Sequence, residues 1–178
     1  NDCSLVCCSR LAQGENVMIT YRQAKFDDVE KIHKLLNDYA KAGLMLPRSR
    51  NAIYENLRDY IVAMQGSHLV GCGALHFVWD RLAEIRSLAV DPELKCTGIG
   101  RNIVELLEKE GIERGVKMFF TLTYQPGFFA KCNYIETAKE KLPQKVWKEC
   151  VYCPQYPYCN EIAFVKTTVD YQPGDILF

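Results

Sequence analysis

The hydrophobic and polar positions of the chain follow two periods, which predicts strands and helices interleaved along the sequence. Continuous or alternating apolar segments bounded by turn residues predict strands, and they lie at 19–23, 60–63, 68–79, 82–90, 118–123, 134–138 and 162–165. Apolar residues three or four positions apart predict helices, and they lie at 28–42, 50–60, 98–114 and 126–131. Short turns join the three strands between residues 60 and 90, so these strands are expected to form an antiparallel meander.

Residues with capping or special backbone chemistry mark where these helices begin and end. Asp27 and Ser49 can accept hydrogen bonds from the first turn of a helix, and each stands just before a helical pattern. Gly43 follows the first pattern, as glycine commonly follows a helix C-terminus. Pro126 suits the first turn of a helix, because the N–H that it lacks would have no partner there.

Length and composition indicate one packed domain. The 178 residues fit the usual size of one hydrophobic core, and 48% of them are apolar. No internal repeat, linker or low-complexity run divides the chain. Residues 1–17 show no strand or helix period and precede the first methionine, Met18. They are interpreted as a leader or extension, and residues 18–178 as a single domain.

The charge balance argues against a polyanionic partner. Lys plus Arg and Asp plus Glu both number 22, so the formal net charge is zero and no overall field attracts nucleic acid or an anionic membrane. No window of about 18 apolar residues exists, and the N-terminus lacks the regions of a secretory signal. These features predict a cytoplasmic protein with a small-molecule substrate.

The nine cysteines divide into single residues and one cluster. Those that fall singly in periodic or loop segments are expected to behave as small buried hydrophobes; they are Cys72, Cys96 and Cys132. Cys150, Cys153 and Cys159 follow one another at C-x2-C-x5-C spacing, which can bind zinc only with a fourth ligand. No histidine lies nearby to act as the fourth ligand, although a cysteine of residues 1–17 could do so. Reduced thiols or a local disulfide are the alternatives, and no metal is predicted.

The segment 88–101 joins a predicted strand to a predicted helix through a loop that ends in Gly98 and Gly100. Unpaired N–H groups at a helix N-terminus carry the positive end of the helix dipole, and glycines let a pyrophosphate approach the backbone. Lys95 and Arg101 can add cationic contacts. The segment matches neither a Walker nor a Rossmann pattern, and its glycines could instead serve a tight turn or helix packing. Alone, it indicates a cofactor that carries a pyrophosphate.

The stretch Lys95–Gly100 resembles motif A of the GNAT family of N-acetyltransferases, Gln/Arg-x-x-Gly-x-Gly/Ala between a strand and a helix, with lysine at the first position. The resemblance extends over 18–166 and includes the aromatic-rich stretch Phe128–Tyr134. It implies an α/β fold with a mostly antiparallel twisted sheet flanked by helices, and acetyl-CoA as cosubstrate. The cofactor-binding residues that it implies are Leu88, Ala89, Val90, Lys95, Cys96, Thr97, Gly98, Ile99, Gly100 and Arg101.

A narrower resemblance points to the acceptor of the acetyl group. Gly43–Arg50 resembles the G-I-L-V-R-R-S-R stretch of the acetyltransferase domain of N-acetylglutamate synthases, and Phe120–Tyr124 resembles their F-V-L-T-T. This implies acetylation of the α-amine of glutamate by a short stand-alone relative, with a role in arginine biosynthesis. Arg48 and Arg50, with Lys145, would then bind an acidic amino acid, since guanidinium groups match carboxylates. Ordinary surface charge is the alternative.

Two residues are candidates for proton transfer. Glu84 shares a strand face with Arg86 and can act as the base if burial raises the pKa of its carboxyl; an ion pair with Arg86 or Arg81 is the alternative. Many family members use a tyrosine as the acid at the position where this chain has Phe129. Tyr124 is the nearest replacement, although a buried structural tyrosine or proton donation by solvent is also possible.

Other functions remain open on the sequence alone. The acceptor could be another small amine or a protein N-terminus, because one fold supports many acceptors. A non-catalytic module that senses CoA or binds a metal would use the same glycine loop. A homodimer is possible.

Overall fold

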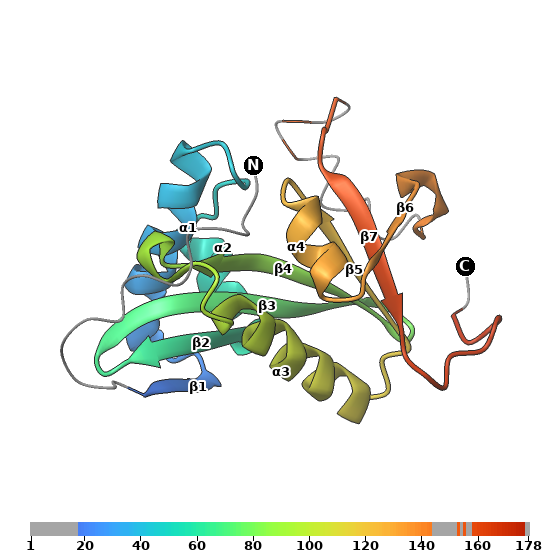
Figure 1. Cartoon of the computed structure of the whole chain (residues 1–178), viewed down its shortest axis with the longest axis horizontal. Coiled ribbons are helices and arrows are strands. Elements are labelled where there is room, and N and C mark those ends of the chain that lie inside the picture. The colour runs from blue at the N-terminus through green and yellow to red at the C-terminus, as the bar shows by residue number, and fades with distance from the viewer. Residues whose placement is uncertain (1–17, 144–152, 154, 156–157, 177–178) are drawn as a thin grey trace.

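A computed structural model of the chain describes residues 18–143, 153, 155 and 158–176. Its strands form one seven-stranded sheet in the order β1-β2-β3-β4-β5-β7-β6 (Figure 1). The strands are β1 Ile19–Gln23, β2 Tyr60–Gln65, β3 His68–Trp79, β4 Leu82–Val90, β5 Met118–Thr123, β6 Ile135–Thr137 and β7 Ile162–Thr167. Every strand predicted from the sequence is present; β2 and β7 run slightly further than predicted, and β6 is shorter.

Neighbouring strands are antiparallel except β4 and β5, which are parallel. The exception follows from the helix between them, because parallel neighbours need a crossover connection. The predicted meander corresponds to β2, β3 and β4. The predicted fold class, a mostly antiparallel sheet flanked by helices, is confirmed.

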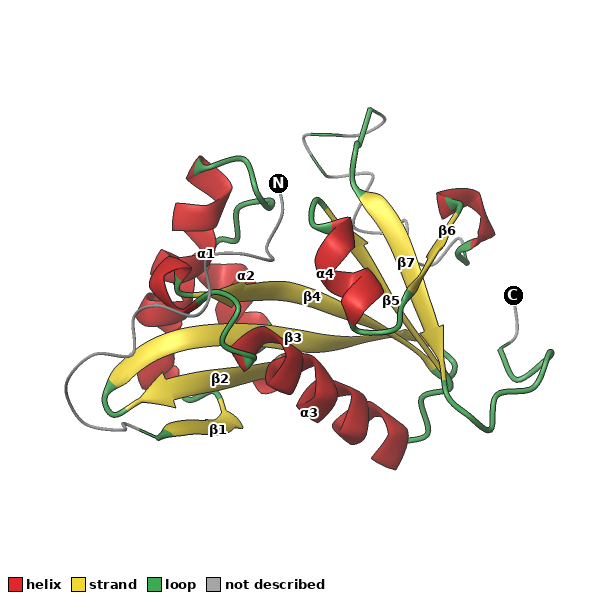
Figure 2. Ribbon diagram, in the orientation of Figure 1, coloured by secondary structure: helices red, strands yellow, loops and turns green. Residues whose placement is uncertain are grey.

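Helices cover both faces of the sheet (Figure 2). The helices are α1 Val29–Lys41, α2 Arg50–Glu55, α3 Ile99–Glu113 and α4 Pro126–Lys131. Residues of α1 and α2 form one apolar cluster with β2 and β3, whereas α3 and Phe129 of α4 belong to the cluster on the other face. α3 packs closely on β3, because a Cβ on Gly73 would stand 2.7 Å from the side chain of Ile103.

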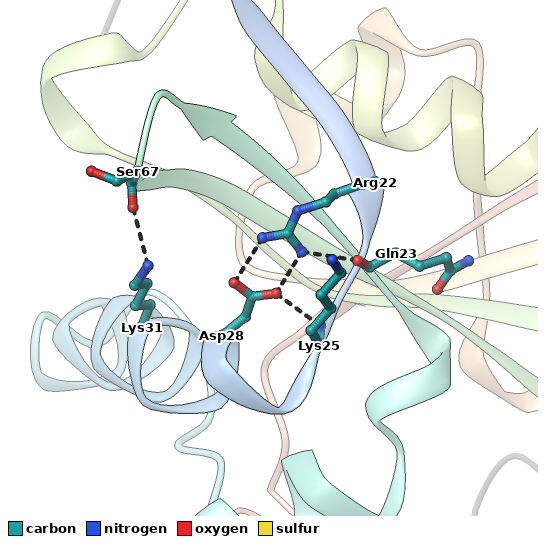
Figure 3. A network of polar contacts seen from close by, with 6 residues as sticks. All are labelled: Arg22, Gln23, Lys25, Asp28, Lys31 and Ser67. Carbon is teal, nitrogen blue, oxygen red and sulfur yellow. Dashed lines mark hydrogen bonds and ion pairs between the residues drawn. The ribbon is translucent and has the colours of Figure 1, made fainter.

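An ion pair anchors β1 to the start of α1 (Figure 3). Arg22 donates to both carboxylate oxygens of Asp28 at 2.6 and 3.0 Å, and the backbone N–H of Lys25 donates to the same carboxylate at 2.8 Å. Asp28 is almost fully buried, and the Arg22 guanidinium holds the pKa of its carboxyl below the usual value. The prediction that Asp27 caps this helix is wrong, because Phe26–Asp28 form a 3-10 turn that leaves Asp28 at the N-cap position.

The predicted start of the second helix and the residues at the end of α1 and the start of α4 are confirmed. The predicted end of the second helix near Tyr60 is wrong, because α2 ends at Glu55 and a 3-10 turn, Leu57–Asp59, leads into β2. The Ser49 side chain accepts a hydrogen bond from the N–H of Ala52 at 3.1 Å. Gly43 follows α1 with a φ of 71°, a left-handed conformation that favours glycine. Pro126 is the first residue of α4.

The single cysteines differ in exposure. Cys72 and Cys132 are buried, as predicted. The prediction for Cys96 is wrong: its side chain is exposed, because the residue lies in the loop before α3 with a φ of 64°. Among the described residues, no helix is both long and apolar enough to cross a membrane.

Candidate active site

Strands β4 and β5 are paired at one end only. Their parallel ladder joins Leu82–Glu84 to Met118–Phe120, whereas β4 continues to Val90 and β5 to Thr123. Beyond Glu84 the two strands diverge (Figure 2). Within the described part of the chain, this edge of β4 has no strand partner past Glu84, so its backbone groups can pair with an extended ligand.

A β-bulge redirects β4 at the point of divergence. Ala74 pairs with Arg86 and Cys72 pairs with Ala89, so the single residue Gly73 on β3 faces two residues on β4. One of these two, Ser87, has a φ of 54°. Such bulges bend a strand and change the direction of its side chains, which separates the inner half of β4 from the half that leads to the glycine loop.

The start of α3 has no side-chain cap. Gly98 occupies the N-cap position with a φ of 91°, and this cap makes no side-chain hydrogen bond. The first N–H groups of a helix lack intrahelical partners and bind anions well, and no acidic residue lies in the first turn of α3. A Cβ on Gly100 would stand 3.2 Å from the ring of Phe128, so glycine also permits the close approach of α4. This end of α3 fits a phosphate-bearing cofactor.

The other predicted cofactor-binding residues surround this helix start. The Lys95 ammonium lies 5.1 Å from the centre of the Tyr39 ring, and the Tyr39 hydroxyl donates to the carbonyl of Val90 at 2.5 Å. Arg101 donates to the carbonyl of Lys131 in α4 at 2.9 Å. The end of β4, the loop and α3 therefore form one contiguous surface, which we call the cofactor cradle (88–101). Its contacts with CoA stay a prediction.

The candidate base lies where β4 and β5 part. Glu84 forms the last parallel pair with Phe120, and its carboxylate lies 3.6 Å from the guanidinium of Arg86. Arg86 also donates to the side-chain oxygen of Asn56 at 3.3 Å. The ion pair considered from the sequence is thus present with Arg86.

We call the region between the diverging ends of β4 and β5 the opening. Tyr124 and Glu161 lie together on its β5 side. The ladder between β5 and β7 ends at Thr123 and Ile162, so the adjoining residues Tyr124 and Glu161 reach the same edge. Burial raises the pKa of the Tyr124 phenol, and the charge of Glu161 raises it further. Burial also raises the pKa of the Glu161 carboxyl, although the hydrogen bond from Cys159 and the charges of Lys139 and Arg48 oppose this shift.

The two arginines proposed for the acceptor have different surroundings. Arg48 is partly buried, its carbonyl accepts from Asn37 of α1 at 2.8 Å, and its charge acts on Tyr60 and Glu161. Arg50 is exposed and donates two hydrogen bonds to Glu30, at 2.6 and 2.8 Å. Arg48 therefore faces the opening, whereas Arg50 is held against α1. Lys145, the third predicted residue, lies outside the described residues.

Three charged or titratable residues of this region are absent from the sequence predictions. Asp59 is the first, and its Oδ2 lies 2.9 Å from Nδ1 of His76, from which the carboxylate accepts when that nitrogen carries the proton. His76 is the cross-strand partner of Glu84. Glu161 is the third. In the sequence, only the chemical type of these side chains could have marked them as candidates. Their place near the opening follows from the strand register, which the sequence pattern does not give.

The cysteine cluster is described only in part. Cys150 lies outside the described residues, and Cys153 and Cys159 are thiols without a disulfide. Cys159 donates to the Glu161 carboxylate at 3.6 Å. Over the described ranges, no group of three potential ligands gathers that could hold a metal ion. The choice among zinc, disulfide and reduced thiols at C-x2-C-x5-C stays open.

A strand edge that opens next to an uncapped helix start fits an extended, phosphate-bearing cofactor. The family model described as Acetyltransferase (GNAT) family matches residues 28–134, more than half of the chain. The chain belongs to this family. It is an acetyltransferase whose cosubstrate is acetyl-CoA.

Similar proteins include both short and long relatives. An uncharacterized N-acetyltransferase of Chlorobaculum tepidum is 44% identical over 146 residues, covering 82% of this chain and 94% of the relative. An amino-acid acetyltransferase of Mycobacterium tuberculosis is 34% identical over 131 residues, covering 72% and 75%. A crystal structure from Mycobacterium tuberculosis, in complex with CoA and a second ligand, has a TM-score of 0.74 at 27% identity and covers 84% and 99%.

The fold extends to a much longer enzyme. N-acetylglutamate synthase of Neisseria gonorrhoeae, in complex with coenzyme A and N-acetyl-glutamate, has a TM-score of 0.77 at 22% identity. The match covers 86% of this chain and 36% of the synthase. At this identity the likeness supports the fold alone.

Proposed function

We propose that this enzyme transfers the acetyl group of acetyl-CoA to the α-amine of an amino acid, with glutamate as the favoured acceptor. The observation that carries the proposal is a carboxylate and a cation on two sides of one opening: Glu84 where β4 and β5 part, and Arg48 facing Glu161 across it. The kinship to an amino-acid acetyltransferase supports a free amino acid as the substrate class.

Glu84 acts as the base in this proposal. An amino acid carries its α-amine mainly as an ammonium ion at neutral pH, and only the neutral amine is a nucleophile. A carboxylate at the point of strand divergence can accept the ammonium proton directly or through one water. Arg86 lies 3.6 Å from that carboxylate and orients it.

The cofactor cradle supplies orientation. The uncapped N–H groups of α3 would bind the pyrophosphate, and the open edge of β4 would align the pantetheine arm toward Glu84. Bound acetyl-CoA supplies an activated thioester carbonyl. Holding the amine against that carbonyl converts a bimolecular reaction into an effectively unimolecular one.

Tyr124 acts as the acid. Its pKa is raised by burial and by the neighbouring Glu161 carboxylate. The phenol therefore stays protonated across neutral and mildly alkaline pH and can donate to the departing thiolate. Phe129, at the position where many family members carry the acid, is buried against Phe128 and Tyr134 and has no proton to give.

Arg48 recognises the acceptor carboxylate, and charge reversal tests this. The double variant Arg48→Glu and Arg50→Glu should raise the KM for glutamate strongly and leave the KM for acetyl-CoA unchanged. Lys41→Glu, at an exposed lysine in the last turn of α1, is the matched control. An unchanged KM for glutamate in the double variant would refute an acidic acceptor.

Glu161 favours a second candidate acceptor. A partly buried carboxylate beside Arg48 repels a second carboxylate and attracts an amide or ammonium group. The rival substrate is therefore an amino acid with a neutral or cationic side chain. Comparing kcat/KM for glutamate, glutamine and lysine in the wild type and in Glu161→Gln separates the two. A gain for glutamate with a loss for lysine in the variant favours the rival, whereas a wild type that already prefers glutamate and gains nothing in the variant favours the acidic acceptor.

The biological setting follows from the acceptor. Acetylation of glutamate would give the enzyme the role in arginine biosynthesis that its sequence resemblance implies. That role, a cytoplasmic location and a homodimer stay predictions.

A further inference from the structure

His76 of β3 lies beside Glu84 of β4. The two residues are direct partners in the antiparallel ladder, and Cβ atoms of such partners are about 4.5–5.5 Å apart on one face of the sheet. Packing gives the same result, because the adjoining residues Leu75 and Ile85 both belong to the core under α3. His76 and Glu84 therefore point to the opposite face. Both side chains stay partly accessible, at 29% and 17%.

Asp59 holds the imidazole of His76. Its Oδ2 lies 2.9 Å from Nδ1, and Asp59 is fixed at the end of the 3-10 turn Leu57–Asp59 that leads into β2. A neutral imidazole that donates its Nδ1–H to a carboxylate has Nε2 as its proton acceptor.

Charged and titratable groups from three elements lie around the pair of His76 and Glu84. Among the described residues these are Asp59 from the 3-10 turn, which contacts His76, Arg86 from β4, which contacts Glu84, and Tyr60 from β2, which pairs with Ala74 of β3 as Arg86 does. Arg86 lies 3.6 Å from the Glu84 carboxylate. Asp59 holds Nδ1 of His76, which leaves Nε2 as the ring nitrogen that can exchange a proton.

We propose that His76, oriented by Asp59, relays the proton from Glu84 to solvent during acetyl transfer. The inference rests on the proposed function, because it takes Glu84 as the base. His76 is then a catalytic residue only in the sense that it exchanges a proton with the base, and Asp59 is a positioning residue.

The proton balance of the reaction requires such an exit. The acceptor ammonium loses two protons in becoming an amide, the nitrogen lone pair forms the C–N bond, and the C–S bond breaks with its electrons on sulfur. One proton ends on the thiolate. Glu84 takes the other, Nε2 of His76 accepts it from Glu84, and water accepts it from His76. Each turnover thus returns both side chains to their starting state.

Steady-state kinetics on the full chain test the relay. The assay uses acetyl-CoA and the amino acid that the wild type acetylates best, with the variants His76→Ala, His76→Gln and Asp59→Asn. We expect both His76 variants to lower kcat by at least about tenfold, with the KM for each substrate unchanged. Imidazole added to His76→Ala should restore part of the lost kcat. The acidic limb of the kcat–pH profile should move in His76→Gln and Asp59→Asn.

His68 supplies the matched control, because it is an exposed histidine at the start of the same strand. His68→Ala should leave kcat and its pH profile unchanged. Wild-type kcat in the His76 variants, or a loss that imidazole does not restore in a folded protein, overturns the relay. If His76→Ala does not fold, wild-type kcat and pH profile in Asp59→Asn overturn it. A wild type that binds CoA but acetylates no amino acid overturns the proposed function and the relay together.

Discussion

The cofactor cradle consists mainly of backbone groups, whereas the proposed acceptor side of the opening consists of side chains that would act on the amino acid. The cradle uses backbone groups of one strand–loop–helix unit, β4 to α3, with glycine at the N-cap of the helix. The acceptor side uses side chains from separate elements: Arg48 before α2, His76 on β3, Glu84 on β4 and Glu161 before β7.

This difference indicates that substitutions can change the choice of substrate more easily than the binding of the cofactor. Backbone N–H groups keep their positions when neighbouring side chains are replaced, so a cradle of this kind serves one cofactor across many sequences. Charged side chains lose their function with one substitution, so the acceptor side can change its substrate while the fold remains. Cofactor binding and acceptor choice should therefore respond separately to mutation.

Glu84→Gln is expected to separate catalysis from cofactor binding more strongly than any other variant. Loss of the proton-accepting carboxylate should lower kcat by roughly 10²–10⁴-fold, while the Kd for CoA, measured by calorimetry, stays at the wild-type value. Glu113→Gln, at an exposed residue that ends α3, is the control. A parallel loss of CoA affinity in Glu84→Gln would show that the two regions are not separable.

Arg48→Ala is the next largest test. A charge-assisted hydrogen bond contributes about 1.5–3 kcal/mol, so the KM for the favoured acidic amino acid should rise by roughly 10–100-fold. Arg50→Ala should have the smaller effect, because Glu30 already holds the Arg50 guanidinium. Equal effects of the two substitutions would contradict the different surroundings of these arginines.

Gly98→Ala probes the cradle itself. A side chain at a φ of 91° is strained, and a left-handed conformation costs about 1–2 kcal/mol for residues other than glycine. If the helix start shifts to relieve this strain, the Kd for CoA should rise by roughly 5–30-fold, with the KM for the amino acid unchanged. Gly127→Ala, where a Cβ meets open space, is the control.

Tyr124→Phe should have the smallest effect, because solvent can replace a proton donor at the mouth of the opening. We expect kcat to fall by about tenfold or less. Since the pKa of Tyr124 is raised, the phenol loses its proton only above the usual range for tyrosine. The wild-type rate should therefore not fall between about pH 8 and pH 9.5. An alkaline decline in that range would argue against Tyr124 as the acid.

The two regions also differ in how far the sequence predicts them. The cradle is local, so the sequence pattern predicts its strand, its loop with Gly98 and its helix, and the structure contains all three; its binding of CoA stays a prediction. The pairing of His76 with Glu84 was not predictable in the same way. A regular hairpin through the turn at Asp80 and Arg81 would place His76 opposite Ile85, and the bulge between Phe77 and Trp79 shifts the register by one residue.

Tertiary contacts decide the remaining cases. Arg48 and Arg50 share one short motif, yet only the position of Glu30 on α1 explains why Arg50 turns away from the opening. Cys96 resembles the other single cysteines in its sequence context, but the left-handed loop before α3 exposes it. The spacing of residues along the chain predicts neither the contact of Arg50 with Glu30 nor the exposure of Cys96.

The most direct test of the account is acetyl-CoA consumption with each of the twenty amino acids, in the wild type and in Glu84→Gln. The account predicts turnover with a small set of amino acids headed by glutamate, release of one CoA per acetylated product, and loss of this turnover in Glu84→Gln. Turnover with no amino acid, or turnover with glutamate that Glu84→Gln leaves unchanged, would contradict it.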